Sequence, residues 1–190
     1  MYHVLSSIKW DLPMAPPAFF LRPPRYEDAS AYCAFIADPD VTVWLEDRCQ
    51  RPLALPQAQA FLVGDAWCRW AIESDGAFVG VTGLEDYDPT RGVARFFIVL
   101  GERSVWGKGL GLAVLRAVLS HGFDRLGLRK VTSDYLESNK GSRIIHHRAG
   151  FTVEGRARQD RWRRGQWVDR VFLSILSEEF RAAEHGQRPA

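Results

Sequence analysis

The spacing of hydrophobic residues along the chain changes several times between a strand-like and a helix-like period, and each change marks an expected element. Short apolar runs bounded by turn residues predict strands over residues 19–22, 69–73, 77–86, 94–100 and 130–136, followed by a hairpin of 151–158 and 167–176. Apolar faces and capping signals predict helices over about residues 26–37, 56–64, 111–123 and 139–148. The order β-α-α-β-β-β-α-β-α-β-β indicates an α/β fold.

The chain divides into one domain and two flanking segments. Residues 1–17 are rich in proline near their end and are expected to form an N-terminal extension. Residues 18–178 form the domain, and the polar residues 179–190 are expected to form a C-terminal tail. A length of 190 residues with 46% hydrophobic residues is sufficient for one substantial core.

A glycine-rich loop joins the apolar strand at 94–100 to the helix that is expected to start at Gly111. The loop runs Val-Trp-Gly-Lys-Gly-Leu-Gly over residues 105–111. Glycines allow backbone N–H groups to approach a ligand closely, and a helix N-terminus favours negative charge, so the arrangement suits phosphate. A Walker loop is excluded because Gly109 follows Lys108, and a dinucleotide fingerprint is excluded because Val114 replaces its last glycine.

A second motif lies about thirty residues further on, in the helix expected after Asn139. Asn139 is followed by Ser142, His146 and the pair Gly150-Phe151. Together the two motifs resemble the Gcn5-related N-acetyltransferase (GNAT) superfamily, closest to its ribosomal-protein-alanine, polyamine and amino-sugar branch.

In this resemblance the family's pyrophosphate loop reads Arg/Gln-x-x-Gly-x-Gly/Ala. Gly109 and Gly111 stand at its two small positions, and Trp106 stands where Arg or Gln is usual. His146 occupies the place of a common Tyr.

The resemblance implies a mixed central sheet of about seven strands with one splayed strand pair, and about four helices. It also implies acetyl-CoA as co-substrate, with no metal. Its expected binding residues are, by chain position, Val99, Leu100, Trp106, Gly107, Lys108, Gly109, Leu110, Gly111, Asn139 and Arg143. The two helices before residue 64 are expected to cover part of the acceptor site, where Trp44 and Leu45 either pack or line a pocket.

Acetyl transfer from a thioester to an amine needs a neutral amine and a proton for the leaving thiolate. His146 is the candidate acid as an imidazolium, or else a surface histidine in an enzyme that relies on solvent. Glu85 and then Glu102 are the candidate bases, with water relay as the alternative. Strand alternation is expected to place Glu85 and Asp86 on opposite faces of the sheet.

Composition changes this picture little. A formal net charge of +2 gives no argument for a nucleic-acid partner, and three cysteines without metal-type spacing are expected to be free thiols. No signal peptide or apolar span of about 20 residues is recognised, so a cytoplasmic location is expected. Six arginines in the last hairpin oppose two aspartates; they are expected to bind cofactor phosphates, an acidic acceptor or RNA, or to form a solvated face.

The resemblance implies an acetyl-CoA-dependent N-acetyltransferase that acts by direct attack in a ternary complex. The acceptor is a primary amine on a protein N-terminus, an amino sugar, a polyamine or another small molecule. A non-catalytic acyl-CoA-binding or interaction module on the same fold is the alternative, and pairing of sheet edges would allow a homodimer.

Overall fold

The computed structural model describes residues 17–64 and 67–184, and the expected N-terminal extension therefore lies outside the described residues except for Pro17. Its centre is a seven-stranded sheet with the order β1-β2-β3-β4-β5-β7-β6. The strands are β1 (Phe19–Arg22), β2 (Cys68–Ser74), β3 (Ala77–Asp88), β4 (Val93–Leu100), β5 (Lys130–Leu136), β6 (Thr152–Arg163) and β7 (Gln166–Leu176). Only the β4–β5 pair is parallel, which confirms the mixed α/β sheet.

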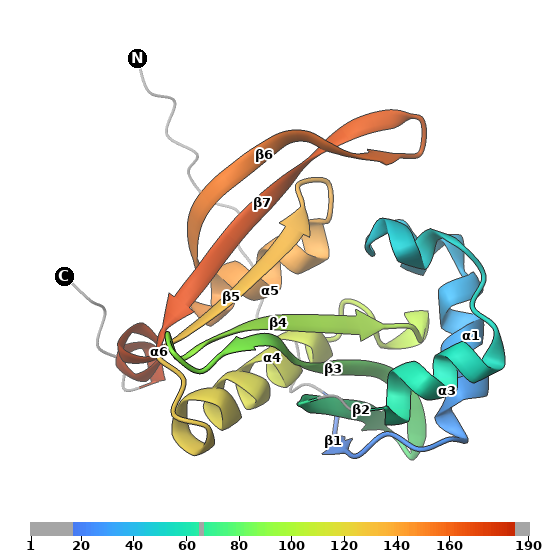
Figure 1. Cartoon of the computed structure of the whole chain (residues 1–190), viewed down its shortest axis with the longest axis horizontal. Helices are drawn as coiled ribbons and strands as arrows, with labels where there is room; N and C mark the ends of the chain where they lie inside the picture. The colour runs from blue at the N-terminus through green and yellow to red at the C-terminus, as the bar shows by residue number, and fades with distance from the viewer. Residues whose placement is uncertain (1–16, 65–66, 185–190) are drawn as a thin grey trace.

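Helices cover both faces of this sheet (Figure 1). The α-helices are α1 (Asp28–Ala37), α2 (Pro39–Thr42), α3 (Leu55–Val63), α4 (Leu110–Ser120), α5 (Lys140–Ala149) and α6 (Ser177–Glu184). Shorter turns are η1 (Asp47–Gln50), η2 (Arg103–Val105) and η3 (His121–Arg125). Sequence signals place their ends: a proline opens α3, and Gly150, with a φ of 93°, closes α5.

Two hydrophobic cores form because strand side chains alternate between the faces. Beneath α4, the fully buried Val114, Leu115 and Val118 pack with strand residues such as Phe96 and Val131. On the other face, α1 and α3 pack on β3 and β4. Their core residues include Tyr32, Ile36, Leu62, Val81 and Val99.

The sheet opens into a fork between its two parallel strands. The β4–β5 pairs end at Arg95 and Thr132, whereas β4 stays paired with β3 to Leu100 and β5 with β7 to Leu136. Figure 1 shows β4 and β5 diverging from their shared end. The splayed strand pair expected from the resemblance is therefore confirmed.

The start of α4 and the C-terminal end of the domain differ from the sequence prediction. Helix α4 begins at Leu110 rather than Gly111, with Gly109 as its N-cap. The expected C-terminal tail is wrong for residues 179–184, because they belong to α6, whose Phe180 is 5% exposed and packs on Phe123 with 5.4 Å between ring centroids. A single phenylalanine in a polar stretch is too weak a periodic signal to predict a helix.

The expected hairpin also differs in length. Both strands extend further toward the turn than predicted, because a bulge between Ala157 and Arg161, with Gln159 at a φ of 51°, accommodates the charged segment. Among the described residues, no helix combines the length and apolar character that a membrane crossing requires.

Candidate active site

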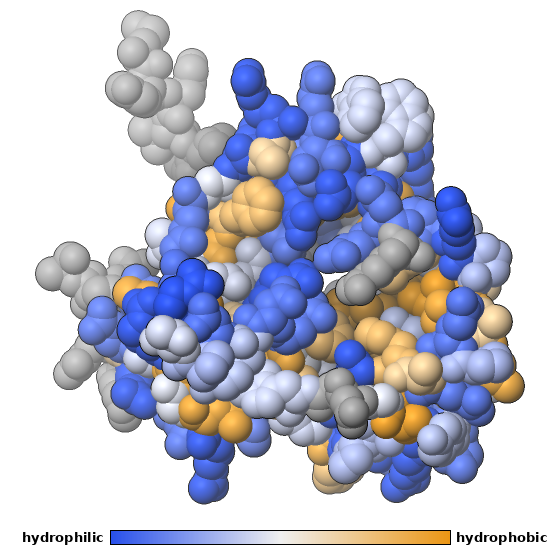
Figure 2. All heavy atoms as spheres, in the orientation of Figure 1, coloured by the Kyte–Doolittle hydropathy of each residue, from blue (hydrophilic) through white to orange (hydrophobic). Residues whose placement is uncertain are grey.

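A cavity of about 360 Å³ lies at the fork between β4 and β5. Its lining comes from α1, the 44–53 segment, α3, β3, β4, β5, α5 and the β6–β7 hairpin. Figure 2 shows apolar atoms gathered in a hollow to the right of centre, framed by hydrophilic side chains. Of the candidates from the sequence, the cavity brings together Val99, Asn139, His146 and Glu85.

The glycine loop ends at the N-terminus of α4. Gly107 and Gly109 have φ values of 73° and 84°, which side chains disfavour, and Gly109 caps α4 without a side-chain hydrogen bond. The first turn of α4 contains no acidic residue, so the N–H groups of Leu110 and Gly111 face no local anion. This geometry suits a pyrophosphate.

Trp106 connects this loop to the end of β4. Its indole N–H donates to the Leu100 carbonyl oxygen at 2.9 Å, while its ring is 36% exposed. The Arg103 guanidinium lies 5.8 Å from the centroid of the same ring. Trp106 therefore holds the loop through the backbone of Leu100, and Lys108 is exposed beside it.

Backbone alternation along β4 decides which groups face the fork. The Phe97 carbonyl oxygen and the Gly101 N–H both bond to β3, so the backbone of Val99 also faces β3. The carbonyl oxygens of Phe96 and Leu100 point away from β3, on the side of β5. Ile98 lies between these two residues, so its backbone groups face the same side. This corrects the expectation for Val99, which contributes its side chain to the cavity while Ile98 presents the backbone groups.

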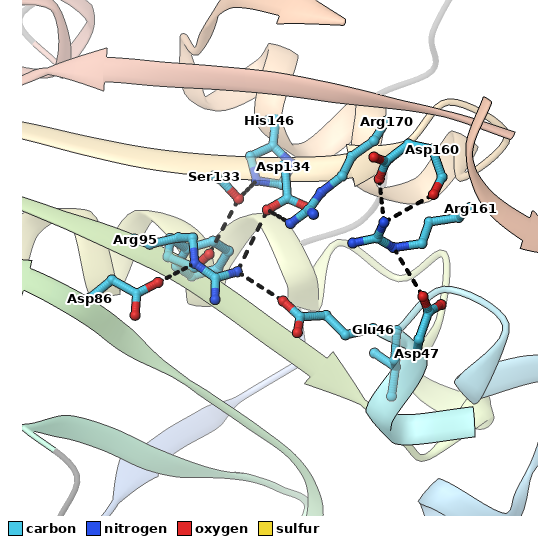
Figure 3. A network of polar contacts seen from close by, with 12 residues as sticks. Glu46, Asp47, Asp86, Arg95, Ser133, Asp134, His146, Asp160, Arg161 and Arg170 are labelled. Carbon is cyan, nitrogen blue, oxygen red and sulfur yellow. Dashed lines mark hydrogen bonds and ion pairs between the residues drawn. The ribbon is translucent and has the colours of Figure 1, made fainter. Parts of the chain in front are cut away.

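His146 is buried, with 2% exposure, and both ring nitrogens have partners. Figure 3 shows the contact with Ser133. Nδ1 lies 2.8 Å from the Ser142 carbonyl oxygen, which can only accept, so Nδ1 carries the proton. Nε2 lies 2.9 Å from the Ser133 hydroxyl oxygen, whose other partner is the Phe96 carbonyl oxygen at 3.3 Å. Burial lowers the pKa of His146 to about 4, although the bond to Ser142 opposes that shift. This lowered pKa disfavours the expected imidazolium acid near pH 7, and the 2% exposure contradicts the alternative of a surface histidine.

The buried His146 is expected to make the fold sensitive to acid. Its pKa is about 4 when folded and about 6.5 in the unfolded chain, so the unfolded state binds more protons between these values and stability falls as the pH drops through them. We expect the wild type to lose about 2 kcal/mol more than His146→Gln between pH 7.5 and pH 5, measured by urea unfolding. His147→Gln, on the exposed neighbour, is the matched control. Equal losses in the wild type and His146→Gln would contradict a neutral buried ring.

The two candidate bases, Glu85 and Glu102, differ in their position relative to the cavity. Glu85 lines the cavity and pairs with Arg95 at 2.8 Å, and Arg95 also binds Asp86 at 2.8 Å. The expected separation of Glu85 from Asp86 is wrong because a bulge, with Asp86 at a φ of 54°, brings both carboxylates to one guanidinium. Glu102 accepts the Ser104 N–H at 2.9 Å, which lowers its pKa, and lies outside the cavity lining.

The two residues of α5 and its cap that were expected to bind the cofactor, Asn139 and Arg143, differ in their surroundings. Asn139 caps the helix by accepting the Ser142 N–H at 3.0 Å, and it lines the cavity as well. Arg143 is exposed and does not line it. Of these two residues, Asn139 therefore borders the cavity and Arg143 faces solvent.

The arginine cluster of the last hairpin is largely engaged inside the protein. Arg163, 7% exposed, donates to the carbonyl oxygens of Val43 at 3.0 Å and Leu45 at 2.7 Å. Arg170 binds both carboxylate oxygens of Asp134 at 2.7 and 2.8 Å. These contacts turn part of the cluster toward the protein interior, and Figure 3 shows Arg161 and Arg170 with their carboxylates. The other members, Arg156, Arg158 and Arg164, are exposed.

Sequence reasoning missed Tyr135 and Arg95. The Tyr135 ring is partly buried, lines the cavity and stacks near His146, with 5.9 Å between centroids and 27° between planes. The period-two pattern of β5 could have found it, because Tyr135 shares a face with Ser133. Arg95 reaches four carboxylates, and the sequence holds no signal for such long-range pairs.

Comparison with known proteins gives concordant matches. The family model described as "Acetyltransferase (GNAT) domain" matches residues 19–152. The uncharacterized N-acetyltransferase p20 of Bacillus licheniformis is 25% identical over 168 residues, covering 84% of this chain and 93% of p20. Spermidine N(1)-acetyltransferase of Escherichia coli K12 is 26% identical, covering 62% of each chain.

Solved structures show the same fold. A GNAT-family acetyltransferase from Bacillus anthracis has a TM-score of 0.73 at 18% identity, covering 88% of this chain and all of that one. Spermidine N-acetyltransferase from Vibrio cholerae, in complex with CoA and spermine, has a TM-score of 0.75 at 17% identity, covering 85% and 97%.

Proposed function

The chain belongs to the GNAT family of acetyltransferases, and on this premise we propose that it moves an acetyl group from acetyl-CoA to a primary amine held in the cavity at the β4–β5 fork. The observation that carries the proposal is the opening of the sheet after Arg95, beside the N-terminus of α4, which has no side-chain cap. Similarity to spermidine acetyltransferases supports a small amine as acceptor.

Acetyl-CoA supplies the acetyl thioester, and residues of this chain fit its parts. The N–H groups of Leu110 and Gly111 would bind the pyrophosphate, with Lys108 screening its charge. The backbone groups of Ile98 would bind the pantetheine arm in the fork, and Asn139 would border the same arm. These contacts orient the donor toward the cavity, where a bound amine can attack.

Tyr135 is the proton donor that we assign to the leaving thiolate. Its phenol lines the cavity beside His146, the position where related enzymes carry a tyrosine on the helix. Burial raises the pKa of Tyr135, so the phenol keeps its proton at neutral pH. His146 then acts on the site indirectly, by packing against that ring.

Glu85 is the carboxylate that we assign to the amine. Of the two candidate bases it is the one that lines the cavity, and its pairing with Arg95 fixes its position. It would orient the amine and receive its proton directly or through water. Glu102 is given no role in this proposal.

Calorimetry with acetyl-CoA, followed by thiol release over a panel of primary amines, tests the function. We expect micromolar binding of acetyl-CoA and release of one thiol for each amide formed. The neutral His146 at the usual tyrosine position favours the second candidate, a non-catalytic acyl-CoA-binding module. Tight CoA binding with no turnover of any amine would support that module and overturn the enzyme.

A further inference from the structure

The acceptor side of the cavity has an apolar wall. It is formed by side chains from α1, α3 and the segment between them. These residues are Tyr32, Ile36, Trp44, Leu45, Leu53 and Phe61. Tyr32 and Phe61 stack with 5.2 Å between ring centroids and 15° between planes, which joins α1 to α3 through an aromatic surface.

Each carboxylate that lines the described part of this cavity already contacts a guanidinium. Arg95 lies 2.8 Å from Glu85, 3.4 Å from Glu46 and 3.6 Å from Asp134. Asp134 is also bound bidentately by Arg170. The described lining therefore combines three carboxylates with four arginines, so its positive charges exceed its negative ones by one.

This distribution of charge in the cavity lining disfavours a polycationic acceptor. Each further ammonium of a polyamine would enter beside Arg95 and lose its hydration without gaining a carboxylate that lacks a cation. A single amine needs one polar partner only, and the neighbouring guanidinium favours its neutral, attacking form. An apolar body on that amine would be removed from water against the wall.

We propose that the acceptor is a primary monoamine with an aromatic body, of the arylalkylamine class, whose ring lies against the Tyr32, Trp44 and Phe61 wall and whose nitrogen lies at Glu85. The assignment rests on the proposed acetyl transfer. The amine nitrogen forms the new C–N bond, the thioester C–S bond breaks, one amine proton leaves toward Glu85 or water, and the thiolate departs as CoA thiol with a proton from the enzyme. The spermidine acceptors of similar enzymes fit this cavity poorly.

A matched amine panel tests the class. Phenethylamine, n-butylamine and spermidine are compared by kcat/KM for thiol release, with each amide identified by mass. Burial of a phenyl ring predicts a preference for phenethylamine over n-butylamine of about 30-fold, and over spermidine of at least about 30-fold. Preference for spermidine would overturn the proposal and leave acetyl transfer intact. Absence of any turnover despite acetyl-CoA binding would overturn the proposed function, and this proposal with it.

Two variants, with one control, test which residues cause the preference for an aromatic amine. Trp44→Ala is expected to lower kcat/KM for phenethylamine about 10-fold with little effect on n-butylamine or on acetyl-CoA binding. Trp67→Ala is the matched control, because Trp67 is 45% exposed, stacks on Tyr87 and does not line the cavity. Arg95→Met removes the shared cation and is expected to raise spermidine turnover relative to phenethylamine. A Trp44→Ala enzyme that keeps the wild-type ratio of phenethylamine to n-butylamine would contradict the aromatic wall.

Discussion

Gly111→Asp is expected to weaken acetyl-CoA binding at least about 100-fold, or about 2.7 kcal/mol. The new carboxylate would stand in the first turn of α4, where the N–H groups of Leu110 and Gly111 face the loop. An aspartate there stabilises the helix through its dipole, yet it repels a pyrophosphate at the same place. Isothermal calorimetry measures the loss directly.

Gly111→Ala separates crowding from charge. A Cβ at this position would meet Leu100 Cδ1 at 3.5 Å and Ile145 side-chain carbons at 3.7 Å, which are ordinary contacts. The alanine variant should therefore bind acetyl-CoA within a few-fold of the wild type. Unchanged affinity in a folded Gly111→Asp variant would refute the pyrophosphate site at this helix.

Tyr135→Phe is expected to lower kcat about 100- to 1,000-fold, because a positioned general acid contributes rate enhancements of this order. The ring and its stacking on His146 stay, and only the hydroxyl is lost. The KM for acetyl-CoA should therefore change little. Steady-state kinetics with a saturating amine separates kcat from KM.

A tyrosine elsewhere provides the control, and a modified phenol provides the pH signature. Tyr87→Phe removes a hydroxyl from a half-exposed ring outside the cavity and should keep wild-type turnover. A fluorinated tyrosine at position 135 lowers the phenol pKa and should move the basic limb of the kcat profile to lower pH. Wild-type turnover by Tyr135→Phe would exclude Tyr135 and leave solvent as the proton source.

Local patterns carried most of the fold prediction. The apolar run ending at Leu100, the glycines at 109 and 111, and the cap at Asn139 each act within a few residues, so the sequence displays them directly. Helix ends and the order of the strands along the chain then follow from short-range geometry. The fork was expected from the resemblance, and nothing in the period of residues 94–100 indicates where pairing with β5 stops.

The chemistry of the cavity depended on contacts that the sequence does not display. Arg95 meets Glu46 and Asp134, which lie 49 and 39 positions away in the chain, and no local pattern links them. The bulge at Asp86 changed the face of one carboxylate, and the burial of His146 changed its charge state. Tertiary environment sets pKa values and ion pairs, so residue type alone does not predict the charge state of His146.

The contacts of Arg163 indicate when the rim of the cavity is completed during folding. Arg163 joins the hairpin to Val43 and Leu45 across 120 and 118 positions, so the rim of the acceptor side depends on the last strands of the chain. Contacts of such high sequence separation form late, and synthesis delivers the hairpin last. A nascent chain released before residue 163 would lack these bonds to Val43 and Leu45 and would also lack β7, which pairs with β5 in the sheet. The rim of the acceptor side and the sheet beneath α4 are therefore both completed last during synthesis.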